Sequence, residues 1–346
     1  MGIISFIVTT VVALLVFGLV VFIHELGHFI VAKKSDVKVN EFAIGMGPTL
    51  FKKIKGETTY AIRLLPIGGF VSMEGEDAES DDSRSFQNIN VFKKMAITVA
   101  GATMNLILGF IVLVILVSTM SLVPTKTIAS FEDGALSQQS GLQVNDEIIA
   151  VNGRRCFIND DVAYEFVRIK DGTAEFTVIR DGNKIVVPNV EFKTTTQEDI
   201  GEMIVQDYKL YGKEKTFLNV LNYSANWGLS MGRMVFLSLI DLITGNIPVS
   251  TLQGPVGIVG IISDAVSIGY QPVLMFLALI SINLGIFNLL PIPALDGGRL
   301  FLLLIEAIRR KPIKQKYEIA IHLVGFVLLI SLMLFATFND ISRLFN

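Results

Sequence analysis

Four stretches of the chain are apolar for long enough to cross a membrane. A spanning helix needs about 20 mostly apolar residues. The stretches run from Ile3 to about Ala32, from about Met95 to Met120, from about Pro272 to Pro291, and from about Ile319 to Phe338. The third is the least regular, because it is interrupted by Ser281, Asn283 and Asn288. Buried helices of a soluble protein are the alternative, but the length of the runs favours a polytopic α-helical membrane protein with about four transmembrane helices.

Between the second and third stretches the pattern changes to short alternating runs. Within residues 124–195, runs such as 174–179 alternate apolar and polar positions, which is typical of strands. Turn-forming pairs separate the runs: Asn152-Gly153, Asp171-Gly172 and Asp181-Gly182. Residues 215–245 then have the amphipathic pattern of a helix that lies at a membrane surface. We predict a small β-rich domain over 124–195, followed by a linker and an interfacial helix within 196–265.

The segment 41–73 is apolar but too broken for a helix. Glycine or proline recurs at positions 45, 47, 48, 56, 66, 68 and 69. This pattern favours a hairpin or a re-entrant loop, and irregular backbone at membrane depth is tolerated only where protein or a water-filled cavity covers it. We therefore expect a membrane-associated β-loop that lines the cavity where the chemistry happens. It lies in an N-terminal membrane core, 1–123, and a C-terminal membrane core would occupy 266–346.

The composition agrees with a membrane location and limits the chemistry. Of the 346 residues, 51% are hydrophobic and only 18% are charged, against about 25% charged in an average soluble domain, so we expect the lipid bilayer to surround the apolar stretches. The net charge is −3 and no basic block is present, so we expect no nucleic-acid partner. Cys156 is the only cysteine, which excludes an intramolecular disulfide and a cysteine-built zinc site.

A candidate metal-binding motif, His24-Glu25-Leu26-Gly27-His28, lies near the end of the first apolar stretch. Residues four apart share one face of a helix, so both imidazoles can reach one ion. Glu25 then lies beside the metal, where it can accept a proton from water. A chance match is the alternative, but polar groups are costly in a membrane helix and are usually functional there. We predict a zinc site with Glu25 as the general base.

The third ligand has two candidates. A catalytic zinc ion takes three protein ligands and keeps one position open. His322, the third histidine of the chain, lies in the last apolar stretch, where a hydrogen-bonded or interfacial histidine is the alternative interpretation. Asp296 follows Pro291-Ile292-Pro293, which breaks the third stretch, and precedes Gly297 and Gly298, which let the backbone approach closely. The pattern favours Asp296.

Two motifs together resemble one known family. HELGH in the first stretch and the run from Asn288 to Gly298, of the form N-x-x-P-x-P-x-L-D-G-G, resemble the site-2 protease family of intramembrane zinc metalloproteases. They occur in the order of that family. One PDZ-like insert between the second and third stretches is similar to the bacterial, RseP- and RasP-like branch. The resemblance covers nearly the whole chain.

The resemblance implies a zinc metalloendopeptidase that hydrolyses peptide bonds in transmembrane segments with a zinc-activated water. It makes His24, His28 and Asp296 the ligands of Zn²⁺ and Glu25 the general base. It also implies that four further residues bind the substrate: Asn288, Asn283, Gly68 and Gly69. For the asparagines, hydrogen bonding between helices is the alternative. The implied partners are single-pass membrane proteins, trimmed beforehand by another protease, such as anti-sigma factors, or remnant signal peptides.

Two segments depart from the family pattern. Gly101-Ala102-Thr103-Met104-Asn105 stands where the family often has A-G-P-x-x-N, so Ala102 removes a helix kink. In the PDZ-like unit, Asn145 stands where glycine is usual before an aspartate. Asparagine is the residue besides glycine that best tolerates a left-handed backbone, so we expect that turn to survive.

Lysine and arginine in the loops predict the orientation in the membrane. The loop after the first stretch opens with Lys33 and Lys34 and closes with Lys93 and Lys94. The short loop after the third stretch carries six basic residues between positions 299 and 316. Positive loops stay cytoplasmic, so we expect a zinc site toward the cytoplasmic side of a bacterial cell membrane. Both termini and the PDZ-like domain would be extracytoplasmic.

Two other classes of function fit parts of the pattern. A metal transporter would need a path of ligands through several spans, yet the apolar stretches offer almost no ionisable groups beyond this one cluster. A non-catalytic scaffold built on the PDZ-like domain would not need Glu25, yet all four catalytic positions are intact. The sequence therefore favours the protease.

Overall fold

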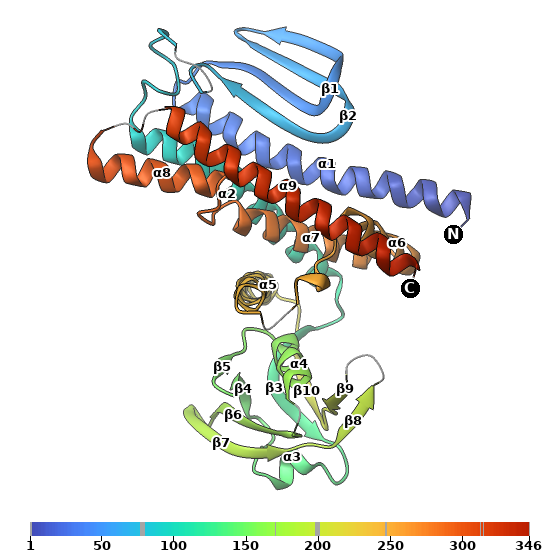
Figure 1. Ribbon diagram of the computed structural model, residues 1–346. Helices are drawn as coiled ribbons and strands as arrows, with labels where there is room; N and C mark the ends of the chain where they lie inside the picture. Colours follow the sequence, from blue (N-terminus) through green and yellow to red (C-terminus); the bar gives the residue numbers. More distant parts are fainter. Residues whose placement is uncertain are drawn as a thin grey trace. The chain divides into compact units, whose positions relative to one another are not determined.

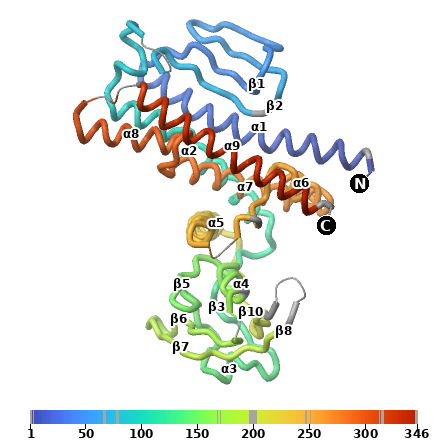
Figure 2. Tube along the Cα trace, in the orientation of Figure 1, coloured from blue at the N-terminus to red at the C-terminus, as the bar shows by residue number. Residues whose placement is uncertain are grey.

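The chain forms two compact units in the computed structural model, which describes residues 2–76, 80–169, 171–197, 201–245, 248–311, 313 and 315–345 (Figure 1). The first unit comprises Met1–Val112 and Val235–Asn346, and the second comprises Leu113–Met234 (Figure 2). The second unit is thus inserted in the sequence of the first, as the pattern predicted for a β-rich domain between membrane segments.

Among the described residues, four helices are long and apolar enough to cross a membrane. They are α1 (Ile3–Lys34), α2 (Val91–Thr119), α7 (Tyr270–Phe287) and α9 (Gln315–Phe345). Each contains most of one predicted stretch, which confirms the polytopic helical fold. Helix α7 ends at Phe287, before Pro291. Beyond it, the N–H groups of Leu289 and Leu290 donate to carbonyl oxygens three residues earlier, which is the pattern of a 3₁₀ turn at a helix end.

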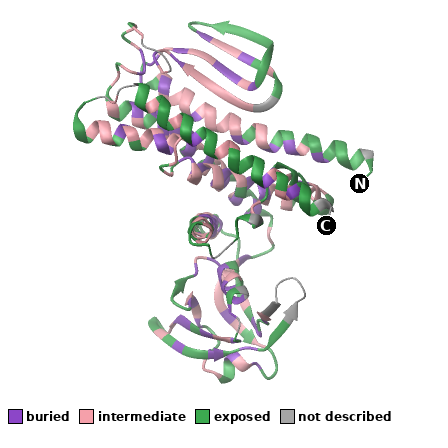
Figure 3. Cartoon of the chain, in the orientation of Figure 1, coloured by how far each residue is buried: buried purple, intermediate pink, exposed green. Residues whose placement is uncertain are grey.

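Many apolar side chains of these helices lie at the surface. The buried share of the most apolar part is 44% in α2 but only 11% in α9. Exposed positions run along α9 and the N-terminal half of α1 (Figure 3). Continuous apolar surfaces of this extent are not stable in water, so these faces contact lipid.

Two further helices complete the first unit, α6 (Pro255–Ile268) and α8 (Asp296–Arg309), with a short 3₁₀ helix at Val249–Thr251. The start of α6 is tied to α9, because the N–H of Gly257 donates to Asp340 at 2.8 Å. The predicted boundary between residues 265 and 266 falls inside α6. This 14-residue apolar helix is too short to be identified as a span from the sequence.

The segment predicted as a β-loop forms β1 (Val39–Lys55) and β2 (Thr58–Met73), which pair in antiparallel fashion. The pair folds back on itself, so Ala43 of β1 opposes both Phe70 and Ala61 of β2. Two glycines at the bends have positive φ, Gly45 (+85°) and Gly68 (+81°). The last part of β2 is consequently an outer strand. The start of β1 and the end of β2 share a small hydrophobic core with the end of α1 and the start of α2. Its buried residues are Ala32, Val37, Val39, Met73, Phe86 and Ile97.

The second unit is built on a six-stranded sheet. Its strands are β3 (Val123–Phe131), β4 (Glu147–Val151), β5 (Arg154–Arg155), β6 (Thr173–Arg180), β7 (Asn183–Glu191) and β10 (Tyr208–Lys213). Their order is β10-β3-β4-β6-β7, with β5 beside β4, and β8 (Thr194–Gln197) pairs separately with β9 (Gly201–Ile204). The sheet continues past residue 195, where the predicted domain ended, because β10 returns to pair with β3.

The turns of this unit follow the local sequence. Asn152-Gly153 and Asp181-Gly182 have φ between 48° and 79° and join β4 to β5 and β6 to β7, as two-residue hairpin turns require. Asn145 has a φ of 72°, so it takes the left-handed conformation expected of it. The helices are α3 (Leu136–Gln139), α4 (Asn159–Arg168) and the first part of α5 (Phe217–Ile243), as far as Met234. Helix α5 is bonded to α4, because the buried Asp161 accepts a hydrogen bond from Ser230 and pairs with Arg233 at 3.0 Å.

Candidate metal centre

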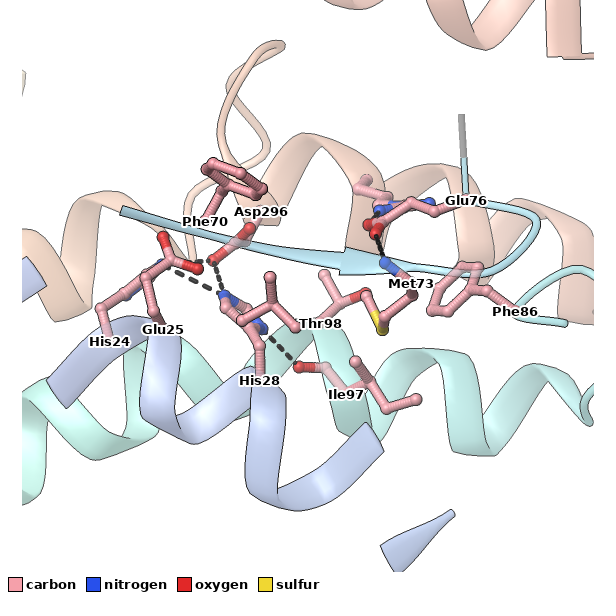
Figure 4. Close-up of a pocket in the computed structure, with 12 residues that line it drawn as sticks. His24, Glu25, His28, Phe70, Met73, Glu76, Phe86, Ile97, Thr98 and Asp296 are labelled. Atoms are coloured by element: carbon pink, nitrogen blue, oxygen red, sulfur yellow. Dashed lines mark hydrogen bonds and ion pairs between the residues drawn. The ribbon is translucent and has the colours of Figure 1, made fainter. Parts of the chain in front are cut away.

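Three potential metal ligands converge from two helices that are far apart in the sequence. Helix α1 carries His24 and His28 on one face, with 3.2 Å between their Nε2 atoms. Asp296 is the first residue of α8, and its Oδ2 lies 3.1 Å from Nε2 of His24 and 3.3 Å from Nε2 of His28. Figure 4 shows the carboxylate facing both imidazoles. This is the only such cluster of histidine, cysteine and acidic side chains found in the described parts of the chain.

The two glycines after Asp296 allow the first turn of α8 to pack against the backbone of the preceding residues, Leu290 to Pro293. A methyl group on Gly297 would overlap the carbonyl oxygen of Leu290, and one on Gly298 would lie 2.5 Å from that of Ile292. Neither position has room for a side chain. The close backbone approach expected from the glycines is therefore present, and it brings Asp296 to the histidines of α1.

The three atoms fit a zinc ion. Ligand atoms about 2.0–2.1 Å from a tetrahedral zinc ion lie about 3.3–3.4 Å from one another. The observed separations of 3.1–3.3 Å match this spacing. In addition, Oδ2 of Asp296 is buried and accepts no hydrogen bond. A buried oxygen without a partner destabilises the fold unless a cation binds it. Geometry and the unsatisfied oxygen therefore agree with a site for Zn²⁺.

Helix α2 orients both imidazoles from behind. Nδ1–H of His28 donates to the carbonyl oxygen of Ile97 at 2.8 Å, which leaves Nε2 with its lone pair toward the site. Nδ1 of His24 lies 3.2 Å from the amide nitrogen of the fully buried Asn105, whose Oδ1 has no partner. With the amide turned over, Nδ1–H donates to Oδ1, and His24 takes the same tautomer.

Gly101 of α2 is packed directly against the two rings. A methyl group there would overlap Nε2 of His28 and would lie 2.8 Å from Nε2 of His24. Sequence reasoning identified Gly101 and Asn105 only as members of a family-like segment. Their contact with the histidines depends on the packing of α2 against α1, which no local pattern reveals.

The cluster opens into a cavity of about 180 Å³. Glu25 lines it beside the histidines, and Phe70, Val71 and Met73 of β2 line another side. The end of β2 crosses the cavity close to Glu25 (Figure 4). The lining is completed by Glu76, Phe86, Ile97, Thr98 and Arg299, together with the three ligand candidates.

The predicted substrate-binding residues are not all near this cavity. A methyl group on Gly69 would lie 3.2 Å from Cγ of Glu25, so this glycine borders that glutamate. Gly68 instead lies against Met46. Asn288 is buried in the cap of α7, and Asn283 has a buried Oδ1 without a partner; neither lines the cavity. His322, the other candidate ligand, accepts a hydrogen bond from the backbone of Ala294.

Arg299 also lies at the site. In the sequence it stood out only as one of the basic residues that predict the orientation in the membrane. It lies one turn after Asp296, forms an ion pair with Glu76 beyond β2, and stacks on Phe86 with 4.4 Å to the ring centre. Its Nε also lies 3.5 Å from Glu318 of α9. Arg299 thus links α8 to the segment that follows the β-loop.

Comparison with known proteins identifies the family of the chain. The family model "Peptidase family M50" matches residues 12–332. A putative zinc metalloprotease of Clostridium perfringens is 38% identical, over 95% of this chain and 97% of its own length. The zinc metalloprotease RasP of Bacillus licheniformis is 31% identical over 97% and 99%, and the regulator of sigma-W protease RasP of Bacillus subtilis is 29% identical over 98% and 100%. The chain therefore belongs to peptidase family M50, the site-2 proteases, and is an intramembrane zinc metalloprotease.

Proposed function

We propose that this protease cleaves transmembrane segments of single-pass membrane proteins, with His24, His28 and Asp296 as zinc ligands and Glu25 as the general base. The observation that carries the proposal is the convergence of three ligand atoms within 3.3 Å of one another, beside Glu25. The bound zinc supplies Lewis acidity toward water and the scissile carbonyl. The chain itself must supply proton transfer, orientation of the ligands and a site for the substrate backbone.

Glu25 has the position for proton transfer. It follows His24 directly on α1 and lines the same cavity as both histidines. In the proposed reaction its carboxylate takes the proton of the attacking water and later gives it to the leaving nitrogen. Ile97 keeps the imidazole of His28 in the tautomer that presents Nε2, and Asn105 does the same for His24 when its amide is turned so that Oδ1 faces Nδ1. No residue becomes covalently attached to the substrate.

The end of β2 is the proposed docking site for the substrate. A transmembrane helix hides its carbonyl groups in internal hydrogen bonds, so it must unwind before cleavage. The residues from Gly69 to Met73 pair with β1 on one side, and no strand within the described residues pairs with their other edge. An unwound segment can add to that edge by β-augmentation and so pass close to Glu25.

The biological substrates are proposed by likeness. The relative from Bacillus subtilis is a regulator of sigma-W protease. We propose, accordingly, that this chain acts on anti-sigma factors already shortened by another protease, or on remnant signal peptides. By likeness to the family, we also propose that four residues contact the substrate: Asn288, Asn283, Gly68 and Gly69.

Removal of the metal tests the proposed activity. We expect the purified, reconstituted protein to cut a single-pass substrate within its transmembrane segment, and a zinc chelator to abolish the cutting. Added Zn²⁺ should restore it, because a chelator removes the ion and leaves the three proposed ligand side chains unchanged. Mass spectrometry of the products gives the cleavage site. A cut outside the transmembrane segment, or cutting that survives full removal of zinc, would contradict the proposal.

Asn288 should affect turnover without affecting the metal. An amide can hold an extended backbone by donating and accepting at once. We expect Asn288→Leu to lower cleavage about tenfold, in line with the loss of a buried hydrogen bond, and to leave the zinc content unchanged. Asn283→Leu in the same helix is the comparison. If both variants lower only the melting temperature, the asparagines act in helix packing instead.

The proposed orientation has both termini and the β-rich, PDZ-like unit outside the cell membrane and the zinc site toward the cytoplasm. Burial raises the pKa of the Cys156 thiol to about 12, so the native cysteine reacts slowly, and Cys156→Ala removes it. In that background, the exposed Arg310→Cys should react with an impermeant maleimide only after the membrane is opened. The exposed Lys184→Cys of β7 should react in intact cells. The opposite labelling pattern would reverse the orientation.

A further inference from the structure

Most of helix α9 is not buried, but one of its faces contacts the turn that leads to Asp296. Only 11% of its most apolar part is buried. Glu318, His322 and Gly325 are spaced four and three residues apart, so they share a face of the helix. Glu318 lies 3.5 Å from Arg299 of α8, and the other two residues contact the turn before Asp296. The face is therefore directed at the segment that delivers the third ligand.

His322 holds the backbone of this turn by one hydrogen bond. The N–H of Ala294 donates to Nδ1 of His322 at 3.1 Å. Ala294 has a φ of +73°, in the left-handed region that residues with a side chain rarely adopt. The hydrogen bond stabilises a conformation that alanine itself disfavours, two residues before Asp296. Because Nδ1 accepts, the proton of the neutral ring is on Nε2.

Gly325 supports the same turn one helical turn further along α9. A methyl group on Gly325 would lie 2.5 Å from the carbonyl carbon and oxygen of Pro293, closer than real contacts. Pro293 therefore packs directly on the backbone of α9. The two contacts hold consecutive residues, Pro293 and Ala294, against one helix.

We propose that His322 is a positioning residue, whose Nδ1 fixes the Ala294 turn and thereby the direction from which Asp296 reaches the metal. This inference rests on the proposed ligand set, because His322 acts through Asp296. A carboxylate on an unsupported turn spends less time in the ligating position. Loss of such an outer contact of a ligand typically costs about 10–100-fold in metal affinity or activity.

The test compares two substitutions that differ in where they present an acceptor. The Oδ1 of asparagine occupies about the place of Nδ1 of histidine, whereas the amide of glutamine reaches about the place of Nε2. We expect His322→Asn to bind zinc within a few-fold of the unaltered protein and His322→Gln to bind it about 10–100-fold more weakly. Affinity is measured by competition with a chromophoric chelator on the purified full chain. The kcat should fall in His322→Gln while KM changes little, since the substrate edge of β2 is untouched.

A second variant keeps the test decisive if His322→Gln is unstable. Ala294→Gly removes the steric penalty at a φ of +73°, so adding it to His322→Gln should recover part of the zinc affinity. Leu323→Ala, at a 59% exposed position of the same helix, is the control and should change nothing. Equal zinc affinities of His322→Asn and His322→Gln, or no recovery with Ala294→Gly, would overturn the proposal.

A parallel measurement on Asp296→Ala separates this inference from the ligand assignment. If Asp296→Ala binds zinc normally, the assignment of Asp296 is wrong. If Asp296→Ala loses zinc while both His322 variants retain it, the assignment holds and only the role of His322 is wrong.

Discussion

Replacing Glu25 by glutamine should leave about one zinc ion bound per chain and reduce cleavage by a factor of about 10²–10⁴, the usual contribution of general acid–base catalysis. Glutamine has the shape of glutamate but cannot take a proton from water and return it. Glu25 lines the cavity but is not one of the three residues whose ligand atoms cluster. Its replacement should therefore leave metal binding unchanged. Zinc is counted by elemental analysis of the purified protein, and cleavage is followed in proteoliposomes.

Variants of the three proposed ligands provide the matched comparison. His24→Ala, His28→Ala and Asp296→Ala should each lower zinc content and cleavage together, because ligands set the affinity. A Glu25→Gln protein that had lost its zinc would make Glu25 a ligand, and one that still cleaved normally would exclude it as the base. Full zinc occupancy and activity in Asp296→Ala would remove Asp296 from the site.

The second large effect should come from one added methyl group. Gly101→Ala should remove most of the bound zinc and the activity, although position 101 supplies no ligand atom. The new Cβ would overlap Nε2 of His28 and would lie 2.8 Å from Nε2 of His24, so it would occupy space that the ligand atoms need. Its neighbours are rings held from behind by Ile97 and Asn105, which leaves little freedom to adjust.

A glycine with free space is the control for Gly101. Gly18 of α1 has no atom within 4 Å of the place where a Cβ would be added. Gly18→Ala should therefore keep zinc and activity, and it gains slightly in helix propensity. If Gly101→Ala binds zinc as well as Gly18→Ala does, the tight packing between α1 and α2 is not what shapes the site.

The sequence predicted the spans, and it singled out the three side chains that cluster in the structure, because these signals are local or chemically unusual. Apolar runs of about 20 residues are visible without any knowledge of packing. His24 and His28 share a helix face by their spacing alone, and few polar residues in the membrane segments compete with Asp296. The hairpin turns at Asn152-Gly153 and Asp181-Gly182 were predictable for the same reason, since each depends on two adjacent residues.

Features that depend on packing between distant segments were not predictable. Asn105 and Gly101 differ from other polar or small residues of α2 only in what they face in the folded chain. Strand β10 joins the sheet through β3, more than 70 residues earlier in the chain, so its own short pattern could not assign it to the domain. The hydrogen bond from Ala294 to His322 likewise joins a turn and a helix that the sequence shows as separate elements.

The wide separation of the proposed ligands in the sequence has a consequence for biosynthesis. His24 and His28 lie in α1, which is synthesised well before α8, the helix that begins with Asp296. At about 5–20 residues per second, the roughly 270 residues between His28 and Asp296 take about 13–54 s to synthesise. A growing or truncated chain that ends before α8 has only two of the three proposed ligands. The proposed ligand set therefore makes proteolytic activity depend on the synthesis of α8, roughly 270 residues after His28.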